Sequence, residues 1–309
     1  MPRRPLHFTK MHGTGNDYVY VDLSQEVVAE PARLARLVSD RHRGIGSDGL
    51  ILVEPLGADD EAEIRMRMFN ADGSEAEMCG NGIRCVTKFA LDRGLAPGPT
   101  LRVATGAGVL DIEAHHEDGE VVAATVDMGH ADTTGASVDA RIPGLEPSAS
   151  TIGIDLDLDR FLPEHADRLR ALGVDPVCSL VSMGNPHIVL WCDRPESIDL
   201  SSVGRDIEHH DWFPQRINVH FVQVTAPDRV LMHTWERGSG VTLACGTGAS
   251  AVCAAGALER RTAEAITARL PGGELELRHD RDRGHVLMRG PAVEVFRGEL
   301  DLAQLEESS

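Results

Sequence analysis

The sequence predicts an α/β (α+β) protein built from two similar halves. At 309 residues the chain is long enough for about two domains. One long unit occurs once in each half: strands, a polar loop, the letters Cys-Gly-x-Gly, a helix and further strands. Between the halves, residues 129–150 are poor in large apolar side chains and rich in Gly, Pro, Ser and Thr, which indicates a linker. A duplicated unit with a pseudo-two-fold axis is expected to bring the two helix N-termini face to face across a cleft.

The first half begins with a predicted pair of strands, residues 6–10 and 18–23, around the turn HGTGN. The apolar spacing within PARLARLVSDRHR predicts a helix over residues 31–43, and Pro31 is suited to its first turn. Alternating or continuous apolar runs predict further strands at 50–54, 62–69, 100–104, 108–114 and 120–127.

A polar loop, residues 70–78, precedes the first Cys-Gly-x-Gly sequence. We expect a helix over about residues 80–92, because Gly94 is suited to end it. In the second half, the corresponding helix follows Cys245 and runs to about Arg260. Strands are predicted before it at 177–183, 187–192, 217–225 and 229–235, and after it at 264–270, 274–279, 285–289 and 292–297.

Composition argues against several classes of partner. The formal net charge is −19, whereas a nucleic acid or an anionic membrane would need a basic face. Aromatic residues make up 4% of the chain, which leaves little material for stacking bases. No segment approaches the roughly 18 apolar residues of a membrane span. No apolar run follows the basic first residues, so we expect no signal peptide. Six cysteines without CxxC pairs are typical of reduced thiols in the cytoplasm.

Two cysteines carry the functional interpretation, Cys79 in MCGNGIRC and Cys245 in LACGTGASAVC. Each lies at a predicted helix N-terminus, where free N–H groups and the positive end of the dipole stabilise a thiolate and bind carboxylates. A thiolate and a thiol in such settings can remove a proton from one face of a carbon acid and return one to the other. That is racemase or epimerase chemistry. A single cysteine is often just a small buried hydrophobe, but two in matching contexts favour the functional interpretation.

Neither a cofactor nor a metal is expected. Lys10 and Lys88 are the only lysines, and neither position suits the Schiff-base anchor of pyridoxal phosphate. GIGSDG, residues 44–49, matches G-x-G-x-x-G, but it follows a helix and precedes a strand, the reverse of the order in dinucleotide-binding folds. GTGASA, residues 246–251, precedes a helix but is separated from the strand before it by polar residues. No Cys or His residues show the spacing of zinc ligands.

Further polar candidates lie at strand ends and in loops. In MGNPHIVL, Asn185 and His187 lie where a turn enters a strand, although a lone histidine is usually a surface or satisfied residue. In WERGSG, Glu236 and Arg237 lie at a strand end before the Cys245 loop, and the alternative is a surface ion pair of little energetic weight. Four asparagines in loops or at strand starts could equally be turn residues: Asn16, Asn70, Asn81 and Asn218.

With these motifs the chain resembles the diaminopimelate epimerase family. Five segments carry the resemblance: KMHGTGND (10–17), NADGSEAEMCGNGIRC (70–85), MGNPH (183–187), INVHFV (217–222) and ERGSGVTLACGTGASA (236–251). The resemblance covers most of the chain. It implies a homodimeric, cofactor-independent isomerase that interconverts LL-2,6-diaminopimelate and meso-2,6-diaminopimelate, in lysine and peptidoglycan-precursor synthesis.

The resemblance also implies a domain arrangement. Each of two pseudo-symmetric domains is expected to be a mostly antiparallel or mixed sheet wrapped around a central helix, with the active site in the cleft between them. The final strand is expected to return to the first domain. Residues 1–127 with 293–309 would then form the Cys79 domain, and residues 128–292 would form the Cys245 domain.

The site residues carried over from the family have three roles. Cys79 and Cys245 resemble the two acid/base thiols, with His187 tuning the first and Glu236 tuning the second. The groups expected to hold the reacting carboxylate are Gly80, Asn81, Gly246 and Thr247. The groups expected to hold the rest of the substrate are Asn16, Asn70, Asn185, Asn218, Glu236 and Arg237. Some family members carry Gln where this chain has Gly49, which puts one substrate contact in doubt.

Two alternatives remain open from the sequence. One is a racemase for another amino acid, such as proline, although Arg237 with several asparagines suits a second carboxylate and amine at the far end of a longer substrate. The other is a dithiol redox or small-molecule binding protein without catalysis.

Overall fold

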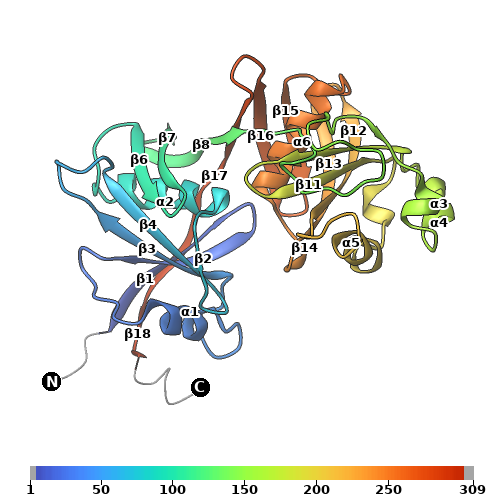
Figure 1. Ribbon diagram of the computed structural model, residues 1–309. Coiled ribbons are helices and arrows are strands. Elements are labelled where there is room, and N and C mark those ends of the chain that lie inside the picture. The colour runs from blue at the N-terminus through green and yellow to red at the C-terminus, as the bar shows by residue number, and fades with distance from the viewer. Residues whose placement is uncertain (1–4, 303–309) are drawn as a thin grey trace. The chain divides into compact units, whose positions relative to one another are not determined.

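The computed structural model describes residues 5–302 of the chain. These residues divide into two compact units. Unit 1 contains the chain up to Asp127 together with the chain from Arg289 onward, and unit 2 contains Met128–Met288. The chain passes from one unit to the other within β8 (Glu120–His130) and β17 (His285–Pro291), which pair with each other (Figure 1). Strands dominate both units, in agreement with the predicted α+β fold.

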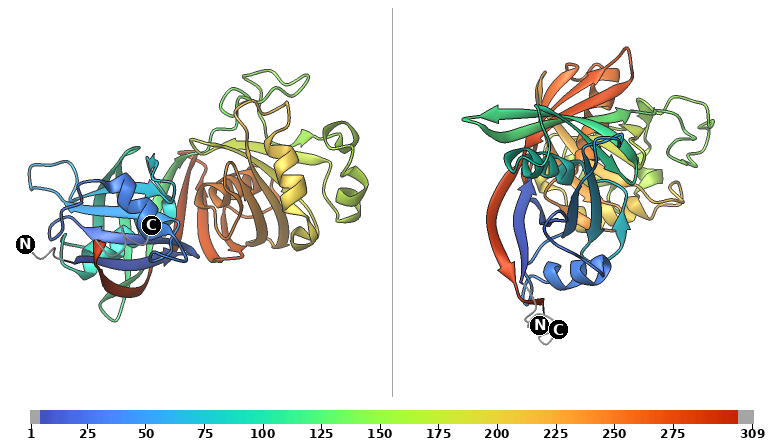
Figure 2. Two further views of the ribbon diagram at one scale, coloured as in Figure 1. Left: turned by 90° about the horizontal axis from the view of Figure 1, so that it is seen from below. Right: turned by 90° about the vertical axis from the view of Figure 1, so that its left-hand side faces the viewer.

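Unit 1 is built on a mixed sheet. Its strands pair in the order β18 (Val293–Leu300), β1 (Leu6–Gly13), β2 (Asn16–Asp22), β3 (Gly49–Pro55), β4 (Ile64–Asn70), β6 (Thr100–Thr105), β7 (Gly108–Glu117) and β8. The pairs β2–β3 and β4–β6 are parallel, and the other pairs are antiparallel. A two-residue strand, β5 (Glu75–Ala76), adds to β4. Strand β18 lies beside β1, so the end of the described chain belongs to the same sheet as its beginning (Figure 2).

Helix α2 (Gly80–Asp92) is the central helix of unit 1. It contacts strands β1, β2, β3, β4, β7 and β18. Ten of its thirteen residues are buried, which is the pattern of a core helix and not of an amphipathic surface helix. Its bounds match the predicted helix. The N-terminus of α2 is therefore held inside the unit by packing on several sides.

Helix α1 (Pro31–Ser39) packs one face against β3 and β4 and leaves the other exposed. The helix ends four residues before its predicted end because Asp40 has a non-helical backbone with φ −58° and ψ 117°. The Asp40 carboxylate then accepts hydrogen bonds from the backbone N–H groups of His42 and Arg43, which fixes a turn.

Unit 2 repeats this arrangement. Its strands pair in the order β9 (Ile154–Asp155), β10 (Val177–Ser182), β11 (Pro186–Trp191), β12 (Asn218–Ala226), β13 (Arg229–Glu236), β15 (Ala265–Leu270) and β16 (Gly273–Asp280), and β14 (Gly240–Thr242) adds to β13. The pairs β11–β12 and β13–β15 are parallel. Antiparallel and parallel pairs thus alternate from β10 to β16 as they do from β1 to β7.

Helix α6 (Gly246–Leu258) takes the place of α2 in unit 2 and contacts β10, β11, β12, β15 and β16. Eleven of its thirteen residues are buried, and most of them are Ala or Gly, so strands approach the helix closely. Both units are therefore sheets around a central helix, and the predicted duplication of one strand–helix–strand unit is confirmed.

Three α-helices and one short 3-10 helix in unit 2 were not predicted: α3 (Leu158–Phe161), α4 (Ala166–Ala171), α5 (Leu200–Glu208) and η1 (Pro195–Ser197). The predicted linker, residues 129–150, contains no helix, but its Val138 is 3% exposed and belongs to the buried cluster of unit 2. This segment is therefore part of the packed unit. Within residues 5–302, no helix combines the length and the apolar character that crossing a bilayer requires.

Candidate functional site

Cys79 is the N-cap residue of α2. Its backbone is extended, with φ −139° and ψ 118°, and its Sγ accepts a hydrogen bond from the backbone N–H of Gly82 at 3.4 Å. The thiol donates to Oδ1 of Asn16 at 3.4 Å. Cys79 is partly exposed, whereas the other five cysteines are buried. The residue type and the helix end therefore place a reactive group where backbone N–H groups can stabilise negative charge.

A tight hairpin places Asn16 beside Cys79. Strands β1 and β2 pair up to Gly13 and Asn16, which leaves Thr14 and Gly15 as a two-residue turn. Both turn residues have positive φ, 52° and 83°, as a type I′ hairpin requires. Strand β2 therefore begins at Asn16. The amide Nδ2 of Asn81, in the first turn of α2, also contacts Oδ1 of Asn16 at 3.4 Å.

Arg84 lies under the N-terminus of α2 and was missed by the sequence analysis. It is completely buried, and its guanidinium donates to the backbone oxygens of Gly80 and Pro291 and to Oδ1 of Asn81 at 2.9–3.3 Å. Burial lowers the pKa of Arg84, while the nearby thiols of Cys85 and Cys79 act in the opposite direction. The sequence signal for this residue was an arginine inside the apolar run IRCV, because a charge buried there needs hydrogen-bonding partners.

The remaining predicted residue of unit 1, Asn70, ends β4. Its Nδ2 donates to Oγ of Ser74 at 3.0 Å, and in the sheet register it is opposite Gly49. Tyr18 neighbours Gly49 in the parallel pair β2–β3. Burial raises the pKa of the Tyr18 hydroxyl well above its usual value, and the Cys79 thiol raises it further.

Cys245 is the N-cap residue of α6 and is 4% exposed. Its Sγ lies 3.7 Å from Oγ1 of Thr247. Burial raises the pKa of the Cys245 thiol well above its usual value, and the nearby Glu236 carboxylate raises it further. Hydrogen bonds from Thr247 and from the backbone of Gly248 act in the opposite direction. Burial and Glu236 therefore favour the neutral form of the Cys245 thiol.

A chain of hydrogen bonds connects His187 to the Cys245 end of α6. Nε2 of His187 lies 2.8 Å from Oδ1 of Asn185, and Nδ2 of Asn185 donates to Oγ1 of Thr247 at 3.4 Å. On its other side, Nδ1 of His187 lies 2.9 Å from Nε2 of His220. His187 and His220 are both completely buried. The relation of His187 to Cys79, which belongs to the other unit, stays a prediction.

Glu236, Arg237 and Asn218 lie together at the ends of β12 and β13. The backbone N–H of Arg237 donates to Oδ1 of Asn218 at 3.0 Å, and Asn218 donates to the backbone oxygen of Pro186. Glu236 accepts a hydrogen bond from Thr242 and acts on the pKa of Cys245. The role of Glu236 in tuning the second thiol stays a prediction.

The two half-sites occupy equivalent places in the repeated units. Tyr18 is opposite Gly49 in β2–β3, and His187 is opposite Asn218 in β11–β12. Tyr18 and His187 are thus equivalent. Asn16 lies two residues before Tyr18, and Asn185 lies two residues before His187, so these two asparagines are equivalent as well. The cysteines share one structural role but have different neighbours: a phenol near Cys79, and a carboxylate near Cys245.

Both lysines of the chain are buried and ion-paired. Lys10 is 7% exposed and contacts Asp17, and Lys88 is 8% exposed and contacts Asp92. Across residues 5–302, no group of three or more His, Cys, Asp or Glu side chains is arranged to hold a metal ion.

Solved structures show that the fold is a known one. A Bacillus anthracis phenazine biosynthesis protein of the PhzF family superposes with a TM-score of 0.62 at 18% identity, covering 97% of this chain and 100% of that one. A hydroxyproline epimerase from Agrobacterium vitis gives 0.58 at 15% identity, covering 98% and 94%. At these identities the likeness concerns the fold alone.

Sequence relatives are much closer. A family model described as diaminopimelate epimerase matches residues 8–134 and 179–295. Proteins named diaminopimelate epimerase from Acetivibrio thermocellus and Desulfovibrio desulfuricans are 44% and 45% identical, covering 97% and 95% of this chain and 100% and 98% of their own. One from Methanothermobacter thermautotrophicus is 43% identical, covering 94% and 97%. The chain belongs to the diaminopimelate epimerase family.

Proposed function

We propose that this protein interconverts LL- and meso-2,6-diaminopimelate by moving a proton at one α-carbon, with Cys79 and Cys245 as the acid and base. The observation that carries the proposal is the repeated placement of a thiol. In each of two equivalent units, a cysteine is the N-cap of the buried central helix. The relatives named diaminopimelate epimerase, at 41–45% identity over nearly the whole chain, support the substrate.

In the proposed reaction one cysteine acts as a thiolate and takes the α-proton while the opposite thiol donates its own proton to the resulting carbanion. The inverted product leaves with one C–H bond broken and one formed, and the two sulfurs have exchanged protonation states. The raised pKa of Cys245 supports this residue as a proton donor. No cofactor takes part in this scheme.

A free amino acid is a very weak carbon acid, so the carbanion needs stabilisation. We assign this role to the N-terminal groups of α2 and α6, namely Gly80, Asn81, Gly246 and Thr247. Fixed N–H dipoles stabilise charge that develops on the α-carboxylate without having to reorganise. We assign the remaining substrate groups to Asn16, Asn70, Asn185, Asn218, Glu236 and Arg237. In this assignment, the Arg237 guanidinium binds the distal carboxylate, and His187 holds Asn185.

The test is deuterium incorporation at the α-carbon during turnover in D2O. Wild-type protein should label diaminopimelate but not proline, because proline has no distal carboxylate or amine to occupy the second set of groups. Cys79→Ala and Cys245→Ala should each abolish epimerisation, and the corresponding serine variants should retain only slow epimerisation. Cys192→Ala, which removes a buried thiol away from both helix ends, should leave labelling intact.

Other outcomes would identify the alternatives. Labelling of proline alone would indicate a proline racemase, and no labelling of either amino acid would indicate a binding or redox protein. Near-wild-type turnover in either alanine variant would rule out the two-cysteine scheme.

We also propose that the enzyme works as a homodimer in the cytoplasm, without nucleic acid or membrane partners. The net charge of −19 supports the last point, since it repels polyanions. Sedimentation equilibrium at micromolar protein concentration tests the dimer.

A further inference from the structure

The segment GIGSDG, residues 44–49, has the letters of a dinucleotide motif but a different place in the fold. It connects α1 to β3, so it lacks the strand–turn–helix order that binds a pyrophosphate. Its fifth residue, Asp48, is fixed through its backbone. The N–H of Asp48 donates to the oxygen of Asp17 at 2.7 Å, and its own oxygen accepts from Ala71 at 3.0 Å.

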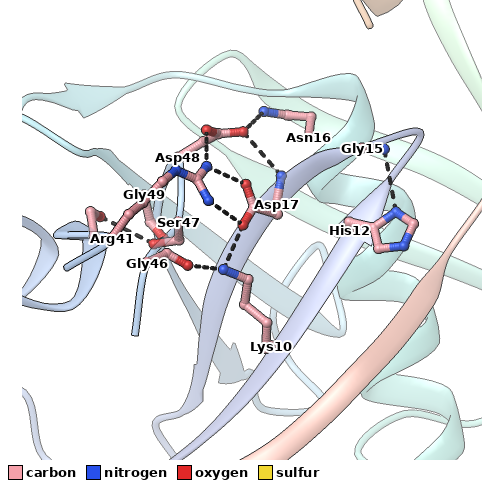
Figure 3. A network of polar contacts seen from close by, with 11 residues as sticks. Lys10, His12, Gly15, Asn16, Asp17, Arg41, Gly46, Ser47, Asp48 and Gly49 are labelled. Atoms are coloured by element: carbon pink, nitrogen blue, oxygen red, sulfur yellow. Dashed lines mark hydrogen bonds and ion pairs between the residues drawn. The ribbon is translucent and has the colours of Figure 1, made fainter. Parts of the chain in front are cut away.

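A charged network surrounds Asp48 (Figure 3). The Arg41 guanidinium contacts Oδ1 of Asp17 at 2.8 Å and Oδ1 of Asp48 at 2.9 Å. The ammonium of Lys10 contacts Asp17 and the backbone oxygen of Gly46. Burial opposes ionisation of Asp17, but Arg41 and Lys10 outweigh it and lower its pKa. The network therefore joins β1, β2 and the GIGSDG segment through ion pairs.

The network ends on Asn16, the residue that accepts the hydrogen bond from Cys79. Oδ2 of Asp48 accepts from Nδ2 of Asn16 at 2.7 Å and from the backbone N–H of Asp17 at 3.1 Å. A carboxylate accepts hydrogen bonds but cannot donate them, so the amide must turn its NH2 group to Asp48. Oδ1 of Asn16 is then directed at Sγ of Cys79 and Nδ2 of Asn81, each at 3.4 Å.

We propose that Asp48 is a positioning residue that fixes the orientation of the Asn16 amide, and through it the hydrogen bonding of the Cys79 thiol. The role of Asn16 at the reacting centre rests on the proposed function. The geometry that Asp48 imposes is supported by five contacts, three of its carboxylate and two of its backbone.

Asn185 is the residue of unit 2 that is equivalent to Asn16, and comparing the two shows the effect of Asp48 on the orientation of the amide. Asn185 has its Oδ1 held by His187, so its NH2 group is directed at Thr247 beside Cys245. In unit 1 the residue equivalent to His187 is Tyr18, and Asp48 takes the opposite end of the amide. The two equivalent asparagines thus present opposite ends: a carbonyl to Cys79, and an NH2 group toward Cys245. The two matching cysteines therefore have different hydrogen-bonding partners, Asn16 for Cys79 and Thr247 for Cys245.

The consequence is measurable without substrate. In the wild type, Oδ1 of Asn16 accepts from the Cys79 thiol, and this contact opposes ionisation of the thiol, whereas the N–H group of Gly82 favours it. An Asn16 released from Asp48 can turn its NH2 group to the sulfur and favour the thiolate, which is the form that alkylates.

The experiment is the rate of iodoacetamide alkylation at Cys79, followed by peptide mass spectrometry at one fixed pH. Asp48→Asn should accelerate it about fivefold, the factor that one neutral hydrogen bond supplies. Arg41→Gln, at a mostly exposed side chain, loosens Asp48 and should also accelerate it, by less. Asp40→Asn is the matched control, because Asp40 accepts hydrogen bonds only from its own turn among the contacts found in residues 5–302.

Charge alone predicts a different pattern. Asp48→Asn removes an anion and Arg41→Gln removes a cation, so a direct field effect would move the two rates in opposite directions. Opposite directions, or no change in Asp48→Asn, would overturn the proposal. In an Asn16→Ala background, Asp48→Asn should cause no further change, and the same acceleration there would also overturn it.

The same protein preparation separates this inference from the proposed function. If wild-type protein labels diaminopimelate in D2O but the alkylation rates do not follow the pattern, the positioning role fails and the epimerase proposal stands. If the alkylation pattern holds but no labelling occurs, the epimerase proposal fails and Asp48 still positions Asn16. If the Asp48→Asn variant does not fold, Arg41→Gln in the wild-type and Asn16→Ala backgrounds decides the question alone.

Discussion

Nδ1 of His187 lies 2.9 Å from Nε2 of His220, and both rings are completely buried. The neighbours of the pair determine its protonation. Oδ1 of Asn185 only accepts, so Nε2 of His187 carries a hydrogen and its Nδ1 accepts from His220. Nδ1 of His220 then accepts from the hydroxyl of Thr234 at 3.0 Å. With both rings neutral, every ring nitrogen has a partner.

Burial enforces this neutral state and makes stability depend on pH. Burial lowers the pKa of His187 well below its usual value, helped by the charges of His220 and Arg237, and burial lowers the pKa of His220 to about 3. From about pH 6.5 down to about pH 3, the unfolded chain therefore binds a proton at His220 that the folded chain does not. The free energy of unfolding should fall with pH in that window by about 1.4 kcal/mol per pH unit for this residue.

His220→Gln tests this dependence, because glutamine can still donate to His187 but does not titrate. Urea unfolding at pH 7 and pH 5 should show a smaller loss of stability on acidification in the variant than in the wild type. His42→Gln, at an exposed histidine, should keep the wild-type difference. An unchanged pH dependence in His220→Gln would mean that His220 is not buried in its neutral form.

The sequence indicated the parts of the site that depend on local signals. Cys79 and Cys245 could be recognised as N-caps because glycines and an apolar helix follow each of them directly. Helix α5 also had a local signal, Leu200, Val203 and Ile207 on one face, which the sequence analysis overlooked. The contact of Asp48 with Asn16 was not predictable, because it joins residues 32 positions apart through the parallel register of β2 and β3. Sequence patterns predict which face of a helix or strand is buried and where the element ends, but they do not predict which residue lies opposite it in a sheet.

Glu236 and Thr247 should shift the pKa of Cys245 in opposite directions. Burial is the largest cause of the raised pKa of the Cys245 thiol, and it remains in variants that change only Glu236 or Thr247. Glu236→Gln removes a charge that disfavours the thiolate, so the pKa should fall. Thr247→Val removes a hydrogen bond that favours the thiolate, so the pKa should rise. Ultraviolet titration of the thiolate in a Cys79→Ser background measures both, and shifts of the same sign would contradict this account of the Cys245 environment.

Close packing around position 49 leaves no room for a side chain larger than that of glycine. A Cβ atom there would lie 2.1 Å from the backbone oxygen of Phe69 and 2.9 Å from Cε1 of Tyr18. Gly49→Ala should therefore lower the free energy of unfolding by about 1–3 kcal/mol, the usual cost of overpacking. Gly57→Ala is the matched control, since its Cβ would lie 3.4 Å from the nearest atom, Oδ2 of Asp60. Equal stability of the two variants in urea would show that β3 and β4 can separate at little cost.

Arg84 links the stability of unit 1 to the reactivity of Cys79. Replacing it with methionine removes the donor to Gly80, Asn81 and Pro291, and each buried acceptor that loses its partner costs about 1–3 kcal/mol. The same change removes a buried cation that interacts with the Cys79 thiol, so alkylation of Cys79 should become slower at a fixed pH.

Arg84→Lys restores the charge but not the planar fork of donors, so it should recover the alkylation rate more fully than the stability. Arg43→Met, at an exposed arginine, should change neither quantity. If Arg84→Met alkylated at the wild-type rate while losing stability, Arg84 would support the helix end only through packing and hydrogen bonds. The charge of Arg84 would then contribute nothing at Cys79, and the helix N-terminus alone would have to stabilise the thiolate.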